Sequence, residues 1–180
     1  MLTEGGKVDP GLVIAASVMY FNDLFKWWFQ YVMLAKTYGS AVYGVNAFII
    51  TIEVDVGQGT QFFMVGLPDS AVKESQQRVE AAIKFFNYQM PRQKVVVNLA
   101  PADIKKEGSF YDLPIALAIL SASNQVDLPA LDQYLVMGEL SLDGQLRPLR
   151  GILPIAIEAR KNGFKGFILP KENAREAAIV

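Results

Sequence analysis

Ser109 and Asp112 are the residues of this chain whose types and spacing could do chemistry without a histidine. They follow a polar stretch that holds Lys105 and Lys106, and they precede an apolar run that begins at Ile115. A serine hydroxyl that is activated by a lysine amine can act as a nucleophile. Sequence spacing alone does not bring a particular lysine to Ser109, so a Ser–Lys pair and ordinary solvated charge are both open interpretations.

The composition excludes most other site chemistries. The chain has 180 residues with no cysteine and no histidine, which rules out thiol catalysis, disulfides, a Ser-His-Asp triad and nearly all zinc sites. It contains no G-x-x-x-x-G-K-[ST] sequence, so it has no P-loop for ATP. We therefore predict no catalytic, cofactor-binding or metal-binding residue within these 180 residues.

The charge balance gives no global attraction to nucleic acid. The formal net charge is −1, and the charges of residues 33–180 cancel, so any contact with nucleic acid would need a local basic patch. The candidates are the basic doublets on predicted loops and strand ends: Lys105, Lys106, Arg147 and Arg150. Plain solvated charge is the alternative for each of them.

The Ser109–Asp112 segment must be positioned by a strand before it and a helix after it. Residues 94–99 (KVVVNL) form a β-branched apolar run of strand length. Asp112 can cap the next helix by accepting N–H groups of its first turn, and Pro114 sits where a missing N–H costs little. The body of that helix, residues 115–122, is almost wholly apolar and is expected to be buried. We expect residues 101–108 to form a surface connection.

The rest of the chain from residue 33 alternates strands with helices. Apolar periodicity predicts strands at 40–45, 48–56, 61–65, 134–141, 145–149 and 164–169, and helices at 71–86, 153–162 and from 172 onward. We expect 61–65 to return as a hairpin partner of 48–56, and 145–149 to pair with 134–141 across Asp143-Gly144. This order predicts a single domain of mixed α/β, or α+β, class with helices packed on a mixed sheet.

Residues 1–32 differ in composition from everything after them. Residues 12–34 are rich in aromatic side chains and long enough to span a bilayer, but Asn22, Asp23 and Lys26 lie near the middle. A central aspartate alone costs about 2.5–3.5 kcal/mol on insertion. We interpret 1–32 as an extension that is not part of the domain formed by 33–180. An accessory helix and a membrane anchor over 12–34 are the alternatives.

Several motifs are specific to one family. These are YGVNAFIITIEVDV, MVGLPDSAVKESQQRVEAAI, VVVNLAPADIKKEGSFYDLPIALAIL and GELSLDGQLRPLRGILPIAIEARKNGFKGFILPKENA. Over residues 34–180 the chain resembles the N-terminal, ChlI-type domain of the YifB/ComM family of Mg-chelatase-like AAA+ ATPases. The resemblance implies a ribosomal-protein-S5-domain-2-like fold, which the proteolytic domain of Lon shares.

The resemblance also implies a context for the chain. In the family a AAA+ module with Walker motifs follows this domain, so the sequence is interpreted as a fragment truncated before that module. The full-length protein is expected to bind ATP and Mg²⁺, to form a homo-hexamer in the cytoplasm, and to handle DNA in natural transformation and recombination. A membrane is not expected as a partner.

The Lon comparison argues against catalysis. It places Asp112 where Lon has its nucleophilic serine and Leu153 where Lon has its catalytic lysine. Neither replacement can do the original chemistry, so we expect a non-catalytic accessory domain that acts in assembly or DNA handling. The alternatives are a Lon-like Ser–Lys hydrolase domain with a degenerate dyad and a module tethered to a membrane through 12–34.

Overall fold

A computed structural model describes residues 33–180 of the chain. The expectations for residues 1–32, and the anchor that would depend on them, lie outside this part. Among the residues described, no helix has the length and apolarity needed to cross a membrane. The strands are β1 (Met33–Tyr43), β2 (Asn46–Gly57), β3 (Phe62–Val65), β4 (Lys94–Ala100), β5 (Tyr134–Val136), β6 (Glu139–Leu140), β7 (Leu146–Arg147) and β8 (Gly166–Ile168).

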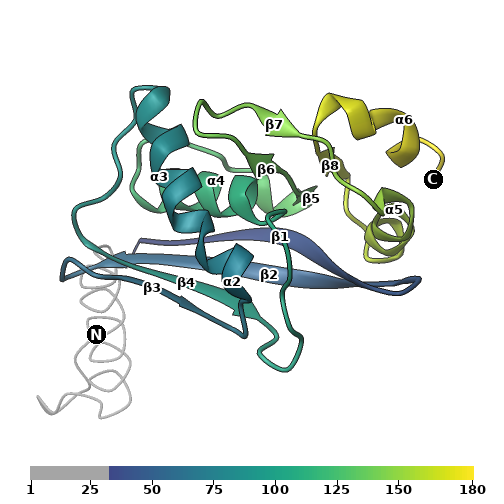
Figure 1. Cartoon of the computed structure of the whole chain (residues 1–180), viewed down its shortest axis with the longest axis horizontal. Coiled ribbons are helices and arrows are strands. Elements are labelled where there is room, and N and C mark those ends of the chain that lie inside the picture. The colour runs from purple at the N-terminus through teal and green to yellow at the C-terminus, as the bar shows by residue number, and fades with distance from the viewer. Residues whose placement is uncertain (1–32) are drawn as a thin grey trace, which may run out of the picture. The chain divides into compact units, whose positions relative to one another are not determined.

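Six of these strands form one sheet in the order β3-β4-β2-β1-β5-β8. The pairs β1–β2 and β2–β4 are antiparallel, whereas β3–β4, β1–β5 and β5–β8 are parallel. Strands β6 and β7 form a separate antiparallel hairpin, as the Asp143-Gly144 turn predicts. The mixed sheet with packed helices confirms the predicted α+β class (Figure 1).

The central strand β2 shows why this sequence forms a sheet. Successive side chains of a strand point to opposite faces, and Ile50, Ile52 and Val54 are fully buried while Thr51 and Glu53 are half-buried. On the wetter face, Glu53 pairs with Lys36 at 3.1 Å and accepts a 3.0 Å hydrogen bond from Asn98. These three residues lie side by side on β1, β2 and β4.

The predicted pairing of residues 61–65 with β2 is wrong. Strand β3 pairs in parallel with β4 instead, with Phe62 opposite Val95. The reason is that β2 is already paired on both edges, with β1 on one side and β4 on the other. The chain therefore crosses to the free edge of β4.

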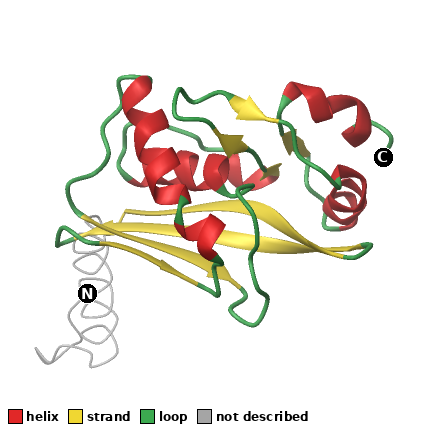
Figure 2. Cartoon of the chain, in the orientation of Figure 1, coloured by secondary structure: helices red, strands yellow, loops and turns green. Residues whose placement is uncertain are grey.

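The helices that bound the site cover one face of the sheet. They are α2 (Ser70–Lys73), α3 (Ser75–Phe85) and α4 (Asp112–Ala122). The predicted helix 71–86 is thus interrupted at Glu74, which ends α2 and precedes α3. Figure 2 shows α3 and α4 above the strands, and a large core cluster joins them to the sheet.

A second, smaller cluster lies around α5 (Ile152–Lys161), with β5, β8 and the short C-terminal helix α6 (Ala174–Ala177). It includes Ala47 and Ile49 of β2, which alternate with Ile50 and therefore face the opposite side of the strand. Single-turn 3₁₀ helices precede β5 and α6.

Candidate functional site

The strongest polar constellation in the described residues is centred on Asp112, the first residue of α4. Its carboxylate is completely buried. Arg78 of α3 donates to both oxygens, from Nε to Oδ2 at 2.6 Å and from Nη2 to Oδ1 at 3.0 Å. The backbone N–H of Leu140 on β6 donates to Oδ2 at 3.1 Å. One carboxylate therefore ties α3, α4 and the β6–β7 hairpin together.

Burial and pairing act in opposite directions on this carboxylate. Burial raises the pKa of Asp112, whereas the hydrogen bonds from Arg78 and Leu140 oppose that rise. In return, the hydrogen bond with Asp112 raises the pKa of Arg78. Bidentate Arg–carboxylate geometry is among the strongest polar interactions in proteins. An aspartate that is fully buried and bound by three donors is not open to a substrate, so we interpret it as a structural anchor rather than an acid or base.

The prediction that Asp112 is the structural cap of α4 is wrong. The residue that caps α4 is Tyr111, and no side chain accepts from the first turn of the helix. A backbone carbonyl accepts from the first turn instead: Gly138 O accepts a hydrogen bond from the N–H of Leu113 at 3.0 Å. The neighbouring β6 segment thus satisfies the helix end, which frees the carboxylate to bind Arg78.

Ser109 does not meet a lysine. Its hydroxyl donates to the carboxylate of Glu139, and Glu139 also pairs with Arg147 at 3.7 Å. A serine that donates to a carboxylate is held in place, and no amine is placed to remove its proton. The Ser–Lys alternative therefore has no geometry behind it in residues 33–180.

Three of the four basic candidates are buried or paired with a carboxylate. Lys105 pairs with Glu107 at 2.6 Å, which raises the pKa of Lys105, and Arg147 pairs with Glu139. Of these four residues, Arg150 alone is both exposed and without an ion-pair partner in the described part of the chain. Exposed ion pairs leave little net field for a phosphate backbone.

The expectation that Lys106 is solvated is wrong. Its side chain is fully buried, Nζ donates to the carbonyl of Pro101, and burial lowers the pKa of Lys106. Its backbone exchanges hydrogen bonds with Leu67 and Asp69, at 3.1 and 3.0 Å. These backbone hydrogen bonds hold the loop that contains Lys106 against the segment before α2, and the Lys106 side chain points inward. A buried side chain cannot contact nucleic acid.

Leu153 lies on the first turn of α5, in a groove whose lining does not include Asp112. Its side chain is 38% exposed and lines a surface groove with Val45 and Ile157. The two positions that the sequence comparison assigns to the Lon dyad therefore hold a buried anchor and an exposed apolar residue.

Arg78 is the site residue that sequence reasoning missed. It follows Ser75 by three residues and precedes Ala82 by four, and both of those residues are buried. An arginine in such a stripe is expected to find a buried carboxylate, and this spacing is the signal that could have identified it. Across the described chain no group of three or more Asp or Glu residues is arranged to hold a metal ion.

Comparison with known proteins gives a consistent family. The family model described as subunit ChlI of Mg-chelatase matches residues 52–173. The chain is 45% identical over 148 residues to the competence protein ComM of Haemophilus influenzae, and equally identical to the uncharacterized protein YifB of Escherichia coli. Each match covers 82% of this chain and 29% of the relative, so the chain spans less than a third of the length of these proteins.

A more distant match is to a Lon protease, from Protochlamydia amoebophila. It is 26% identical over 148 residues, covering 76% of this chain and 17% of that protease. This likeness agrees with the expected relation to Lon, and the placement of Asp112 and Leu153 at the dyad positions stays a prediction.

Proposed function

From the premise that the chain belongs to the YifB/ComM family of Mg-chelatase-like proteins, we propose that it is a non-catalytic accessory domain of a AAA+ ATPase that handles DNA. The observation that carries this proposal is the 45% identity to a competence protein over 82% of the chain. The geometry supports the non-catalytic part, because Asp112 is committed to Arg78 and Ser109 to Glu139.

In this proposal the partner of the domain is the AAA+ module of the same full-length protein. That module supplies the P-loop, and it would bind ATP and Mg²⁺ as a homo-hexamer in the cytoplasm. The domain contributes to assembly of the hexamer or to guiding DNA, in transformation and recombination. The Asp112–Arg78 anchor suits such a role, since its hydrogen bonds link α3, α4 and the β6–β7 hairpin.

Exchange of domains tests the accessory role. The matching segment of Haemophilus influenzae ComM is replaced by residues 34–180 of this chain, and transformation frequency is measured beside a strain that lacks the segment. We expect the chimera to restore most of the frequency that the deletion strain loses. A chimera as defective as the deletion strain, with normal protein levels, contradicts the proposal.

The absence of catalysis has its own test. The purified chain is incubated with ATP and with unfolded casein, and phosphate release and peptide release are followed. We expect neither product above the buffer control. Casein cleavage that disappears in a Ser109→Ala variant would establish the hydrolase alternative instead.

A further inference from the structure

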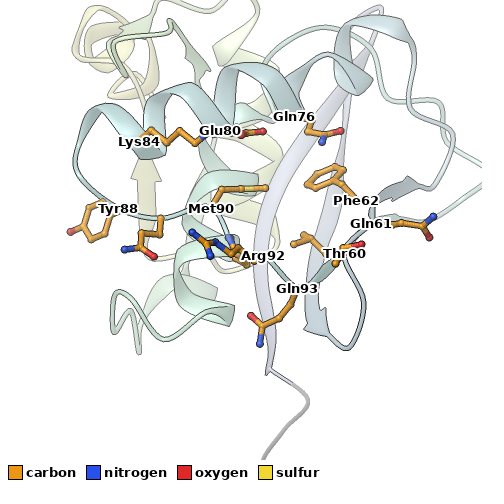
Figure 3. Close-up of a pocket in the computed structure, with 13 residues that line it drawn as sticks. Thr60, Gln61, Phe62, Gln76, Glu80, Lys84, Tyr88, Met90, Arg92 and Gln93 are labelled. Carbon is orange, nitrogen blue, oxygen red and sulfur yellow. Dashed lines mark hydrogen bonds and ion pairs between the residues drawn. The ribbon is translucent and has the colours of Figure 1, made fainter.

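A cavity of about 500 Å³ lies between α3 and the loops that flank β3 and β4. Its size falls in the usual range of small-molecule sites, roughly 300–1,000 Å³. Figure 3 shows Gln76, Glu80 and Lys84 along α3 on one side, with Met90 and Arg92 across from them. None of these residues belongs to the Asp112 constellation.

The floor of this cavity is apolar and fixed. Phe62 and Met90 both line it and both pack against the main core cluster. An aromatic ring and a thioether that are held by the core offer a flat, polarisable surface of fixed position. Such a surface suits the face of a planar ring.

The walls carry hydrogen-bonding groups with no internal partner. Gln61, Gln76 and Gln93 line the cavity, and among the described residues none of their side-chain amides makes a hydrogen bond. Each amide offers both donors and an acceptor. The edges of nucleobases carry the same two kinds of group, and glutamine pairs with them readily.

The charge of the cavity is set by Arg92. Glu80 and Lys84 neutralise each other in a 2.6 Å ion pair, whereas Arg92 is exposed and has no ion-pair or hydrogen-bond partner in the described part of the chain. An unpaired guanidinium beside a polar cavity favours an anionic ligand, and its planar fork matches a phosphate.

We propose that this cavity binds one nucleotide unit of single-stranded DNA. The base lies against Phe62 and Met90, the glutamine amides bond its edge, and Arg92 contacts the adjacent phosphate. The inference rests on the DNA-handling part of the proposed function and assigns it a place on the domain. A free nucleotide shares this chemistry and is separated from the strand by the test below.

Fluorescence anisotropy of a labelled single strand of about ten nucleotides, which is within the usual site sizes, tests the assignment on the whole chain. Arg92→Ala is expected to weaken binding about tenfold and to reduce the salt dependence by the equivalent of about one phosphate contact. The matched control is Arg175→Ala, which removes the same charge from another exposed arginine without a partner, on α6. We expect the control to change affinity less than about twofold.

Gln93→Ala provides a variant with unchanged charge. It is expected to alter the preference among dA, dT and dC strands without changing the salt dependence, because it removes contact with a base edge only. Both Arg92 and Gln93 are exposed, so these variants are expected to fold normally, with melting curves as the check.

The outcomes separate the two proposals. Binding by the wild type that is unaffected by Arg92→Ala, or weakened equally by Arg175→Ala, overturns the cavity assignment and leaves a role on DNA in place. Failure of the wild type to bind any strand overturns both the assignment and direct DNA handling by this domain. AMP that competes as well as the strand identifies a free nucleotide as the ligand, and an acidic peptide bound more tightly than the strand overturns the ligand class.

Discussion

Replacing Asp112 by alanine should destabilise the domain far more than the loss of a helix cap. The change removes a fully buried carboxylate and leaves the Arg78 guanidinium with Ala71 O at 2.9 Å and only a weak 3.8 Å pairing with Glu74. Breaking a buried ion pair from one side costs about 3–5 kcal/mol, and the unpaired Leu140 N–H adds about 1–3 kcal/mol. The Arg78 side chain is 20% exposed, which places the expected loss at the lower end of this sum, about 4–5 kcal/mol.

Asp112→Ser separates this reasoning from the capping hypothesis. Serine is a good helix cap, so capping predicts a cost near zero for serine and about 0.5–2 kcal/mol for alanine. The ion-pair interpretation predicts that serine is nearly as damaging as alanine, because its hydroxyl cannot hold both nitrogens of Arg78. Asp112→Asn keeps an oxygen that can accept from the Leu140 N–H, so it should cost less than either alanine or serine.

Equilibrium urea unfolding at neutral pH measures these differences. The control is the double variant Asp112→Ala with Arg78→Met, which removes both charges and should be more stable than Asp112→Ala alone. A cost for Asp112→Ala below about 1 kcal/mol, or full recovery by serine, would refute the anchoring role.

Three further predictions concern the surrounding fold. Gly66→Ala should prevent stable folding, because φ is +97° and an added Cβ would lie 2.0 Å from Leu99 O. The control is Gly151→Ala, where φ is +76° and the space around the residue is open. Urea unfolding should show a cost of only about 1 kcal/mol for this control. Hydrogen bonds from Asn98 and Lys36 lower the pKa of Glu53, so its ionised form stabilises the fold above the ordinary pKa and that stability is lost as pH falls through the lowered value. Melting temperatures at pH 7 and pH 3 should therefore show a deficit for Glu53→Gln that shrinks in acid, and an equal deficit at both values would contradict the pairing. A chain that starts at Met33 should melt at the same temperature as the whole chain, because the strands and helices from β1 onward account for both core clusters; a large fall on deletion would show that residues 1–32 pack into the domain.

Local patterns predicted most elements because each depends on neighbouring residues. The alternation in β2 and β4 and the apolar α4 are found near their predicted bounds. The Asp143-Gly144 hairpin is found, but its strands are shorter than predicted, because residues 134–136 of the predicted strand 134–141 join the main sheet as β5. The pairing of β3 was not predictable in the same way, since it depends on which edges of β2 and β4 are already occupied.

The candidate site was less predictable than the fold for a related reason. The sequence identified Asp112 as a residue at the start of a buried helix, but it did not identify Arg78 as its partner, because Arg78 lies 34 residues away in the chain. Lys106 looks solvated within a polar run of residues, and only the backbone bonds to Leu67 and Asp69 turn it inward. Contacts between distant segments decide burial, and burial decides what a charged side chain can do.

These contacts also predict that restoring the Lon dyad creates no hydrolase. Asp112→Ser with Leu153→Lys supplies both side chains, but position 112 is fully buried beneath Arg78 and Leu140, where no substrate carbonyl can approach. Position 153 opens onto the groove beside Val45, whose lining does not include residue 112. We expect the double variant to be destabilised like Asp112→Ser and to release no peptide from casein. Cleavage that disappears when either change is reversed would show that residues 112 and 153 do meet, and it would refute this prediction.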